Sequence, residues 1–135
     1  MKYYLIAAVL LCFASGAGAQ GRKTVKEKGI LSVTVEEYFL EEGMKEPVVE
    51  SFERFNEDGE RIELKEYNKR GEIKKWEQYV YDGKGQLIEE KFLDDRGKVV
   101  RTEKSVFTDG LRTEKFFYDQ RGRLFKKKVY VYEYQ

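Results

Sequence analysis

Six glycines recur at nearly even spacing through residues 59–122 and constrain the fold more than any other feature of the sequence. The steps between them are 12, 14, 12, 13 and 12 residues, and the positions are Gly59, Gly71, Gly85, Gly97, Gly110 and Gly122. Five of them close a four-residue polar stretch that begins with Asn or Asp and follows an aromatic residue or leucine. An Asn or Asp side chain bonds to the backbone two residues on, and glycine adopts a positive φ without a Cβ clash. The spacing therefore predicts a series of tight structural turns.

The turns define a repeat of 26 residues. Gly59 and Gly85 lie 26 residues apart, as do Gly71 and Gly97, whereas the next two intervals of this kind are 25 residues. The missing residue is explained by a shorter turn that ends at Gly110, because its Asp-Gly pair is favoured in two-residue hairpin turns. A fixed period is typical of repeat architectures, and the repeating unit is predicted to be one β-hairpin.

The segments between the turns have the composition of β-strands. They are rich in Val, Ile, Tyr, Phe and Thr and contain no proline. Their ends are apolar and their centres are charged, so no face of the sheet is wholly apolar. We predict an all-β domain, an antiparallel meander of about eight strands that forms an open twisted sheet or a partly closed barrel. The strands are expected at residues 30–39, 48–55, 62–67, 72–81, 88–93, 98–107, 113–118 and 123–134, with one helical turn within 41–47.

Residues 1–19 have the features of a secretory signal peptide. Lys2 precedes an apolar run over residues 3–14, and small residues occupy positions 17–19. We expect cleavage near Ala19 and export to the periplasm or the extracellular space. The run is about a dozen residues, fewer than the roughly 20 that a membrane-spanning helix needs, so no membrane span is expected. The mature chain would comprise a flexible polar leader at residues 20–29 and a single β-repeat domain at residues 30–135.

The composition of the mature chain argues against several classes of partner. Without residues 1–19, which contain Lys2 and no acidic residue, basic and acidic side chains number 25 each. A chain without surplus positive charge has no general attraction for nucleic acid or anionic lipid, so neither is expected as a partner. The single cysteine, Cys12, lies in the predicted signal peptide, so the mature domain cannot form a disulfide.

Residue patterns for catalysis and metal binding are missing from the sequence. The chain has no histidine, which removes the commonest general base and the usual metal ligand. Its acidic residues alternate with lysine along the strands, which is typical of a solvated charged surface, and there is no Asp-x-Asp-x-Asp-Gly calcium loop. We therefore assign no catalytic residue, no cofactor and no metal site, and expect a protein that is not an enzyme.

Aromatic side chains offer a candidate binding surface. Trp76, Tyr79 and Tyr81 would provide rings for stacking against a sugar or a peptide if they shared an exposed face. Strand alternation separates the set, because Trp76 and Val80 are predicted to point to one face and the two tyrosines to the other. The basic run at residues 126–128 is expected to protect an edge strand against unwanted pairing.

Two of the turn sequences resemble a known bacterial repeat. Residues 81–87, Tyr-Asp-Gly-Lys-Gly-Gln-Leu, and residues 118–124, Tyr-Asp-Gln-Arg-Gly-Arg-Leu, are similar to the YD repeat of RHS-type proteins, whose core is Tyr-Asp-x-x-Gly-Arg-Leu. Weaker copies at the other turns extend the resemblance over residues 55–124. The resemblance implies a β-sheet of the kind that forms shells or spirals in large secreted proteins, where it encloses or displays other parts. The chain has no toxin domain, so only the sheet-forming property carries over.

A second, shorter resemblance points to another family of repeats. The positions of Trp76 and Tyr79 are similar to the aromatic positions of MORN-like repeats in antitoxin-type proteins. This resemblance implies a binder of the immunity or antitoxin kind. It covers only the neighbourhood of the aromatic residues.

These features predict an exported, non-enzymatic β-repeat protein that acts as an interaction or scaffold module for a protein or glycan partner. Two alternatives remain open at this point. One is a small-ligand carrier in which eight strands close into a barrel with an aromatic-lined cavity, and an open sheet would reject it. The other is the immunity or antitoxin-like binder that the second resemblance implies.

Overall fold

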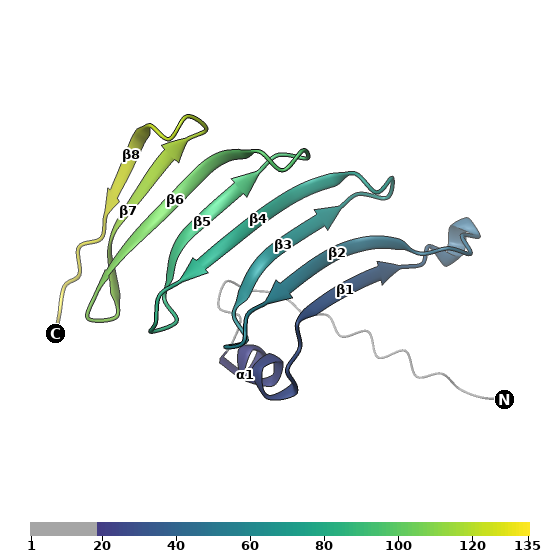
Figure 1. The fold of residues 1–135 in the computed structure, drawn as a ribbon, viewed down its shortest axis with the longest axis horizontal. Coiled ribbons are helices and arrows are strands. Elements are labelled where there is room, and N and C mark those ends of the chain that lie inside the picture. Colours follow the sequence, from purple (N-terminus) through teal and green to yellow (C-terminus); the bar gives the residue numbers. More distant parts are fainter. Residues whose placement is uncertain (1–18) are drawn as a thin grey trace.

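Eight strands pair in sequence order in one antiparallel sheet (Figure 1). The computed structural model describes residues 19–135. Its elements are α1 (Ala19–Lys28), β1 (Ser32–Glu37), η1 (Leu40–Glu42), β2 (Val48–Phe55), β3 (Arg61–Tyr67), β4 (Ile73–Tyr81), β5 (Leu87–Leu93), β6 (Val99–Thr108), β7 (Leu111–Asp119) and β8 (Leu124–Val129). The edges are β1 and β8, so the sheet is open. The predicted all-β meander is confirmed, and the barrel-based ligand carrier is rejected.

Five of the turns share one hydrogen-bonding pattern, which explains their common sequence. In the turn at residues 94–97, Asp94 Oδ1 accepts hydrogen bonds from the backbone N–H groups of Arg96 and Lys98, at 3.0 and 2.9 Å. The Gly97 N–H donates to the Asp94 carbonyl at 3.1 Å, and Gly97 has a φ of 82°. The same bonds recur in the turns that begin at Asn56, Asn68, Asp82 and Asp119.

The turn between β6 and β7 is shorter, as its sequence predicts. Asp109 and Gly110 both have positive φ, at 51° and 80°, and they connect the paired residues Thr108 and Leu111. Positive φ at both central residues is the geometry for which Asp-Gly is preferred in two-residue hairpins. This turn accounts for the two 25-residue intervals that span it.

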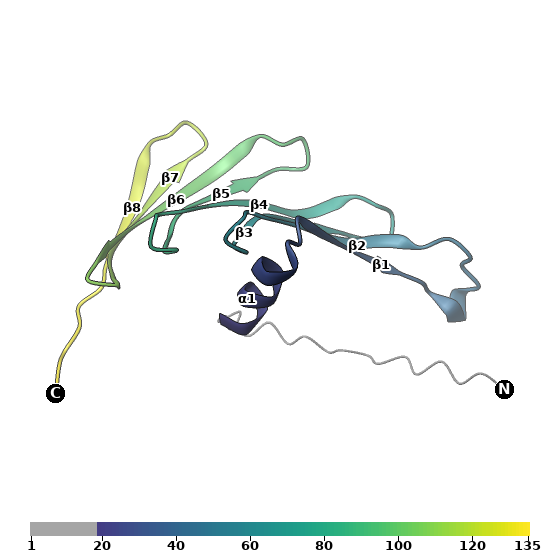
Figure 2. The same cartoon turned by 60° about the horizontal axis from the view of Figure 1, so that its bottom comes forward.

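Every strand pair also contains one irregularity of register, and in five pairs it lies at the residue directly before the Asn or Asp of the turn. The register shifts once in each of the seven pairs, for example between Glu66 and Tyr67 in β3 and between Val80 and Tyr81 in β4. Such β-bulges bend a strand and increase its twist. The sheet is curved into an arch with one concave face (Figure 2).

The sheet has one layer, and its burial differs from that of a globular core. Among the described residues, the buried apolar side chains are Leu64, Tyr79 and Phe117, each 6 or 7% exposed. Three carboxylate side chains are buried to the same degree, namely Glu60, Glu63 and Glu103. The charged strand centres, which the sequence suggests to be solvated, thus include some of the most buried groups of the sheet.

The segment expected to be a flexible leader forms most of α1, so this expectation is wrong. The helix ends at Lys28 and is followed by Gly29, whose φ is 62°, and the Ile30 N–H donates to the Val25 carbonyl at 3.0 Å. Lys26 and Lys28 in the last turn complement the helix dipole. Figure 2 shows α1 on the concave side of the sheet, beneath the half that holds β1–β4. Contacts with distant turns position this polar segment, and a local pattern cannot reveal them.

The remaining boundaries differ from the predictions in small ways. β8 ends at Val129, whereas the last strand was expected to reach residue 134. A helical turn is present as η1, close to the predicted range of 41–47. The predicted signal peptide lies outside the described residues apart from Ala19, where α1 begins. No helix in residues 19–135 is both long and apolar enough to span a membrane.

Replacing Gly97 by valine is expected to destabilise the protein more than replacing the adjacent Lys98 by valine. The φ of Gly97 is positive, a conformation that costs an L-residue roughly 1–2 kcal/mol. A Cβ at this position would also lie 3.1 Å from two ring atoms of Trp76. Lys98 is not among the residues with positive φ. Urea unfolding of the two variants measures the difference, and equal free energies of unfolding would contradict this role of the glycine.

Candidate binding site

The structure separates the three aromatic residues that the sequence suggests as a binding surface. All three lie on β4. Trp76 lies on the convex face, where its Nε1–H donates to Glu63 at 2.9 Å. Tyr79 and Tyr81 lie on the concave face, and the Tyr81 hydroxyl donates to the Arg61 carbonyl at 2.8 Å. The three rings therefore form no joint stacking surface.

The strand register places two rows of side chains on the concave face. Residues paired across strands share a face, so each row follows from the pairing. The first row runs through Val33, Glu53, Leu64, Glu77, Phe92 and Arg101. The second row lies two residues further along the strands and contains Tyr79, Glu90, Glu103, Phe117 and Lys126. We refer to these two sets as the concave rows.

Two glutamates of the second row stand directly opposite each other. Glu90 and Glu103 are paired across β5 and β6, an arrangement in which like charges repel. Lys115 of β7 reaches both, with its Nζ 2.7 Å from Glu103 and 3.4 Å from Glu90. Desolvation lowers the pKa of Lys115, but its bond to Glu103 and the charge of Glu90 outweigh that effect and raise the pKa above the ordinary value. Lys115 is thus the shared counter-ion of two carboxylates.

Basic groups lie over the aromatic rings of the concave rows. The pairs are Arg61 with Tyr79 at 5.3 Å, Arg101 with Phe92 at 3.9 Å and Lys126 with Phe117 at 4.2 Å from the ring centre. A cation in this position is attracted by the ring quadrupole, with about 0.5–1 kcal/mol at exposed sites. The concave face therefore presents rings that already carry cations, alternating with carboxylates.

The stability of the sheet is expected to fall steeply above pH 10 because of Tyr79. Desolvation, together with the hydrogen bond that its hydroxyl donates to Glu77 and the charge of Glu77, raises the pKa of Tyr79 far above the ordinary tyrosine value. Below about pH 10 the hydroxyl is protonated in both states, and the full stabilisation is present. As the pH rises further, the unfolded state loses its proton first, so the free energy of unfolding decreases.

Tyr79→Phe should therefore show a flatter alkaline decline than the wild type. The free energy of unfolding in urea, measured at about pH 9 and about pH 11, gives the two slopes. Tyr38→Phe, which removes the hydroxyl of a ring that is 54% exposed, serves as the control and should keep the wild-type slope. If the free energy of unfolding of Tyr79→Phe declines with pH as steeply as that of the wild type, Tyr79 is not the cause of the alkaline decline.

Charged side chains attach α1 to the turn of the sheet that joins β2 and β3. Arg22 Nη2 lies 2.9 Å from Glu60 Oε1, and Arg22 Nε donates to the Asp58 carbonyl at 3.1 Å. Lys26 Nζ lies 3.3 Å from Asp58 Oδ1. A Cβ on Gly59 would come within 2.4 Å of the Arg22 carbonyl oxygen. Glycine at this turn therefore permits both the positive φ and the close approach of the helix.

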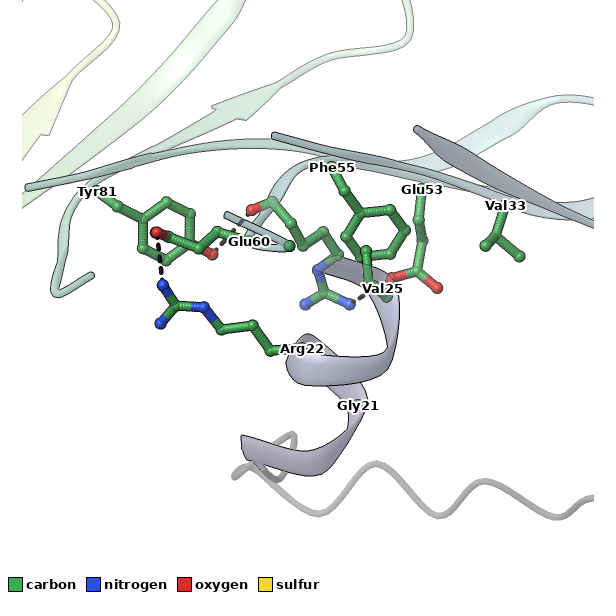
Figure 3. Close-up of a pocket in the computed structure, with 10 residues that line it drawn as sticks. Gly21, Arg22, Val25, Val33, Glu53, Phe55, Glu60 and Tyr81 are labelled. Carbon is green, nitrogen blue, oxygen red and sulfur yellow. Dashed lines mark hydrogen bonds and ion pairs between the residues drawn. The ribbon is translucent and has the colours of Figure 1, made fainter. Parts of the chain in front are cut away.

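A cavity of about 460 Å³ lies between α1 and the concave face (Figure 3). α1 contributes Arg22 and Val25, and the sheet contributes Val33, Phe55 and Tyr81 among others. Figure 3 shows the side chains of Val33 and Phe55 pointing from the sheet toward the helix. Small-molecule sites in proteins have volumes of roughly 300–1,000 Å³, so the cavity is large enough for such a ligand.

Sequence reasoning identifies neither the cavity nor the charge bridge at Lys115. The cavity exists only because α1 packs on turns that are distant in the sequence. The sequence does contain a signal for the charge bridge. Leu64, Glu90 and Lys115 occupy one position of the repeat, 26 and 25 residues apart. Equivalent positions of a hairpin repeat share a face, so this spacing places the lysine beside the glutamates.

Comparison with other proteins adds no assignment. No protein-family model matches the chain, and no curated protein matches its sequence. In the part of the chain that the structure describes, no three His, Cys, Asp or Glu side chains are grouped so as to hold a metal ion. What the protein binds has to be inferred from the geometry of the concave face.

Proposed function

We propose that this chain is an exported, non-enzymatic β-repeat protein that binds a protein partner on the open part of its concave face. The proposal is carried by the concave rows over β5–β8, where carboxylates, cations and aromatic rings alternate on a curved surface. α1 lies at the other end of the sheet and leaves this part uncovered (Figure 2). Aromatic and arginine side chains are enriched at protein interfaces. The resemblance of the turns to YD repeats, which enclose or display other parts of large secreted proteins, supports the same class.

A protein suits this surface better than a glycan does. Sugar stacking needs ring faces that are open to the ligand, whereas Tyr79 and Phe117 are each 7% exposed and carry cations. Charged groups of both signs match a partner that also carries both, as protein surfaces do. A glycan partner is therefore an alternative outcome of the experiment below.

Lys126 and Lys127 provide matched variants for this experiment. They are adjacent on β8, both are exposed, and they lie on opposite faces. Lys126 lies over Phe117 on the concave face, and Lys127 lies 5.3 Å from the centre of the Phe116 ring on the convex face. In a pull-down from the exported proteins of the source organism, Lys126→Glu is expected to retain the partner roughly tenfold less than the wild type. Lys127→Glu should retain it normally.

The captured material identifies the class of partner. Protease treatment of the exported material before the pull-down should abolish the capture, and glycosidase treatment of the same material should not. Equal capture by the two variants would rule out a partner on the concave face, and loss after glycosidase treatment alone would replace the protein with a glycan. Thermal unfolding of both variants verifies that each has folded. The non-enzymatic assignment would be overturned if the protein turned over a substrate and if substitution of an acidic residue abolished that turnover.

A further inference from the structure

The cavity under α1 has mostly apolar walls. Val25 of the helix faces Val33 and Phe55 of the sheet, and Tyr81 closes one side. The Tyr81 hydroxyl is engaged with a backbone carbonyl, so the ring is the part of this residue that is available to a ligand. Apolar walls with a few polar groups are typical of small-molecule sites. The body of a ligand that fits here is therefore apolar.

The charged groups around the cavity are balanced. Arg61 Nη1 lies 3.1 Å from Glu53 Oε2, and Arg22 Nη2 lies 2.9 Å from Glu60 Oε1. Each of the four side chains thus has a partner of opposite charge. A ligand with a net charge would meet no unpaired counter-ion, and its desolvation would remain uncompensated. The lining favours an uncharged ligand.

One hydrogen-bond acceptor in the lining lacks a partner. The side chain of Glu60 is 4% exposed, and its Oε2 is buried without a hydrogen bond. A buried carboxylate oxygen without a donor costs free energy, so a donor brought by a ligand would be stabilising. Glu60 lines the cavity, and the terminal torsion of glutamate is broad, so binding would require a rotation of the carboxylate that brings Oε2 to the ligand.

We propose that the cavity between α1 and the concave face binds a small uncharged molecule with an apolar body and one hydrogen-bond donor, which is directed at the carboxylate of Glu60. The site is separate from the surface proposed for a protein partner, because its sheet wall comes from β1–β4 and the other surface lies over β5–β8. It is also unrelated to a barrel interior, since its second wall is a helix. Arg22, which also lines the site, is the ion-pair partner of Glu60.

Three related dyes test both the shape and the donor. N-phenyl-1-naphthylamine is uncharged, has one N–H donor and becomes fluorescent in apolar surroundings. Its N-methyl derivative lacks the donor, and 1-anilinonaphthalene-8-sulfonate adds a negative charge. The purified full-length chain is expected to bind the first dye with one equivalent. The other two should bind roughly tenfold more weakly, which is the effect of one lost hydrogen bond to a charged group or of one unpaired charge.

Substitutions locate the bound dye. Val25→Trp fills the cavity and should abolish binding, whereas Val106→Trp, at a valine that is 44% exposed on the sheet, should leave it unchanged. Val33→Trp blocks the same cavity from the opposite wall and replaces the first variant if α1 no longer folds. Circular dichroism verifies the fold of each variant. Lys126→Glu should bind the dye normally, so failure of this proposal is distinguishable from failure of the proposed function.

Three results would overturn the proposal. The first is wild-type affinity in both cavity variants, which would place the dye elsewhere. The second is equal affinity for the N-methyl dye, which would remove the role of Glu60. The third is equal or tighter binding of the sulfonated dye, which would contradict an uncharged ligand.

Discussion

Gly59→Ala is expected to lower the free energy of unfolding by about 3 kcal/mol, and Gly71→Ala by about 1 kcal/mol, although both glycines close the same kind of turn. Their φ values are alike, at 75° and 77°, so the backbone strain is shared. A Cβ on Gly59 would lie 2.4 Å from the Arg22 carbonyl oxygen, whereas a Cβ on Gly71 would have nothing within 4 Å. The difference is the loss of α1 from the sheet, which also leaves the buried carboxylate of Glu60 without its arginine.

Urea unfolding of the two alanine variants measures this difference. Gly59→Ala should also lose helical signal in circular dichroism, while Gly71→Ala should keep it. If the two variants have equal stability and equal helical signal, α1 is not held at this turn.

Lys115→Met is expected to destabilise the protein by about 3 kcal/mol, because it leaves two opposed carboxylates without their shared cation. The side chain of Glu103 is 7% exposed, so solvent cannot replace the lysine. Methionine keeps the apolar stem of the lysine and removes only its charge. Arg101 still bonds to Glu103 at 2.9 Å, and this bond limits the loss.

Lys127→Met is the matched control for this prediction. Its ion pair with Glu114, at 3.3 Å, joins side chains that are 47% and 36% exposed, and such surface pairs contribute about 0–1 kcal/mol. The double variant Lys115→Met with Glu103→Gln should recover most of the lost stability, because it removes a carboxylate together with its cation. The free energies of unfolding in urea provide the comparison. Equal effects of Lys115→Met and Lys127→Met would show that burial does not strengthen the charge bridge.

Turn positions, strand number and strand order follow from local chemistry, and they are the features that the sequence predicts well. Asp94 and Gly97 specify their turn through bonds that span no more than five residues. Serial hairpins then permit a meander without any long connection. The arch is different, because the spacing of the glycines does not show how far the register shifts beside the turns, such as that between Val80 and Tyr81, bend the sheet.

The candidate sites were predicted less well, for two physical reasons. Alternation along β4 correctly separates Trp76 from Tyr79 and Tyr81, but it does not tell which rings are covered by cations from other strands. The position of α1 depends on the contact between Arg22 and Glu60, which lie 38 residues apart in the sequence. Most residues of α1 favour a helix, but they are polar and form no apolar stripe, so no periodic pattern reveals the helix or the cavity beneath it.

The strict pairing of each strand with its neighbours in the sequence has a consequence for how the protein forms. As the chain emerges from the ribosome or from an export channel, every hairpin completes its hydrogen bonds once its second strand is out, and no strand waits for a distant partner. α1 is the exception. It emerges before the sheet, but Asp58 and Glu60, which bind Arg22, emerge 36 and 38 residues later. The helix can therefore dock only after the turn between β2 and β3 has been made. At every stage the growing sheet ends in one newly formed edge, and the last of these edges is β8 with its three lysines.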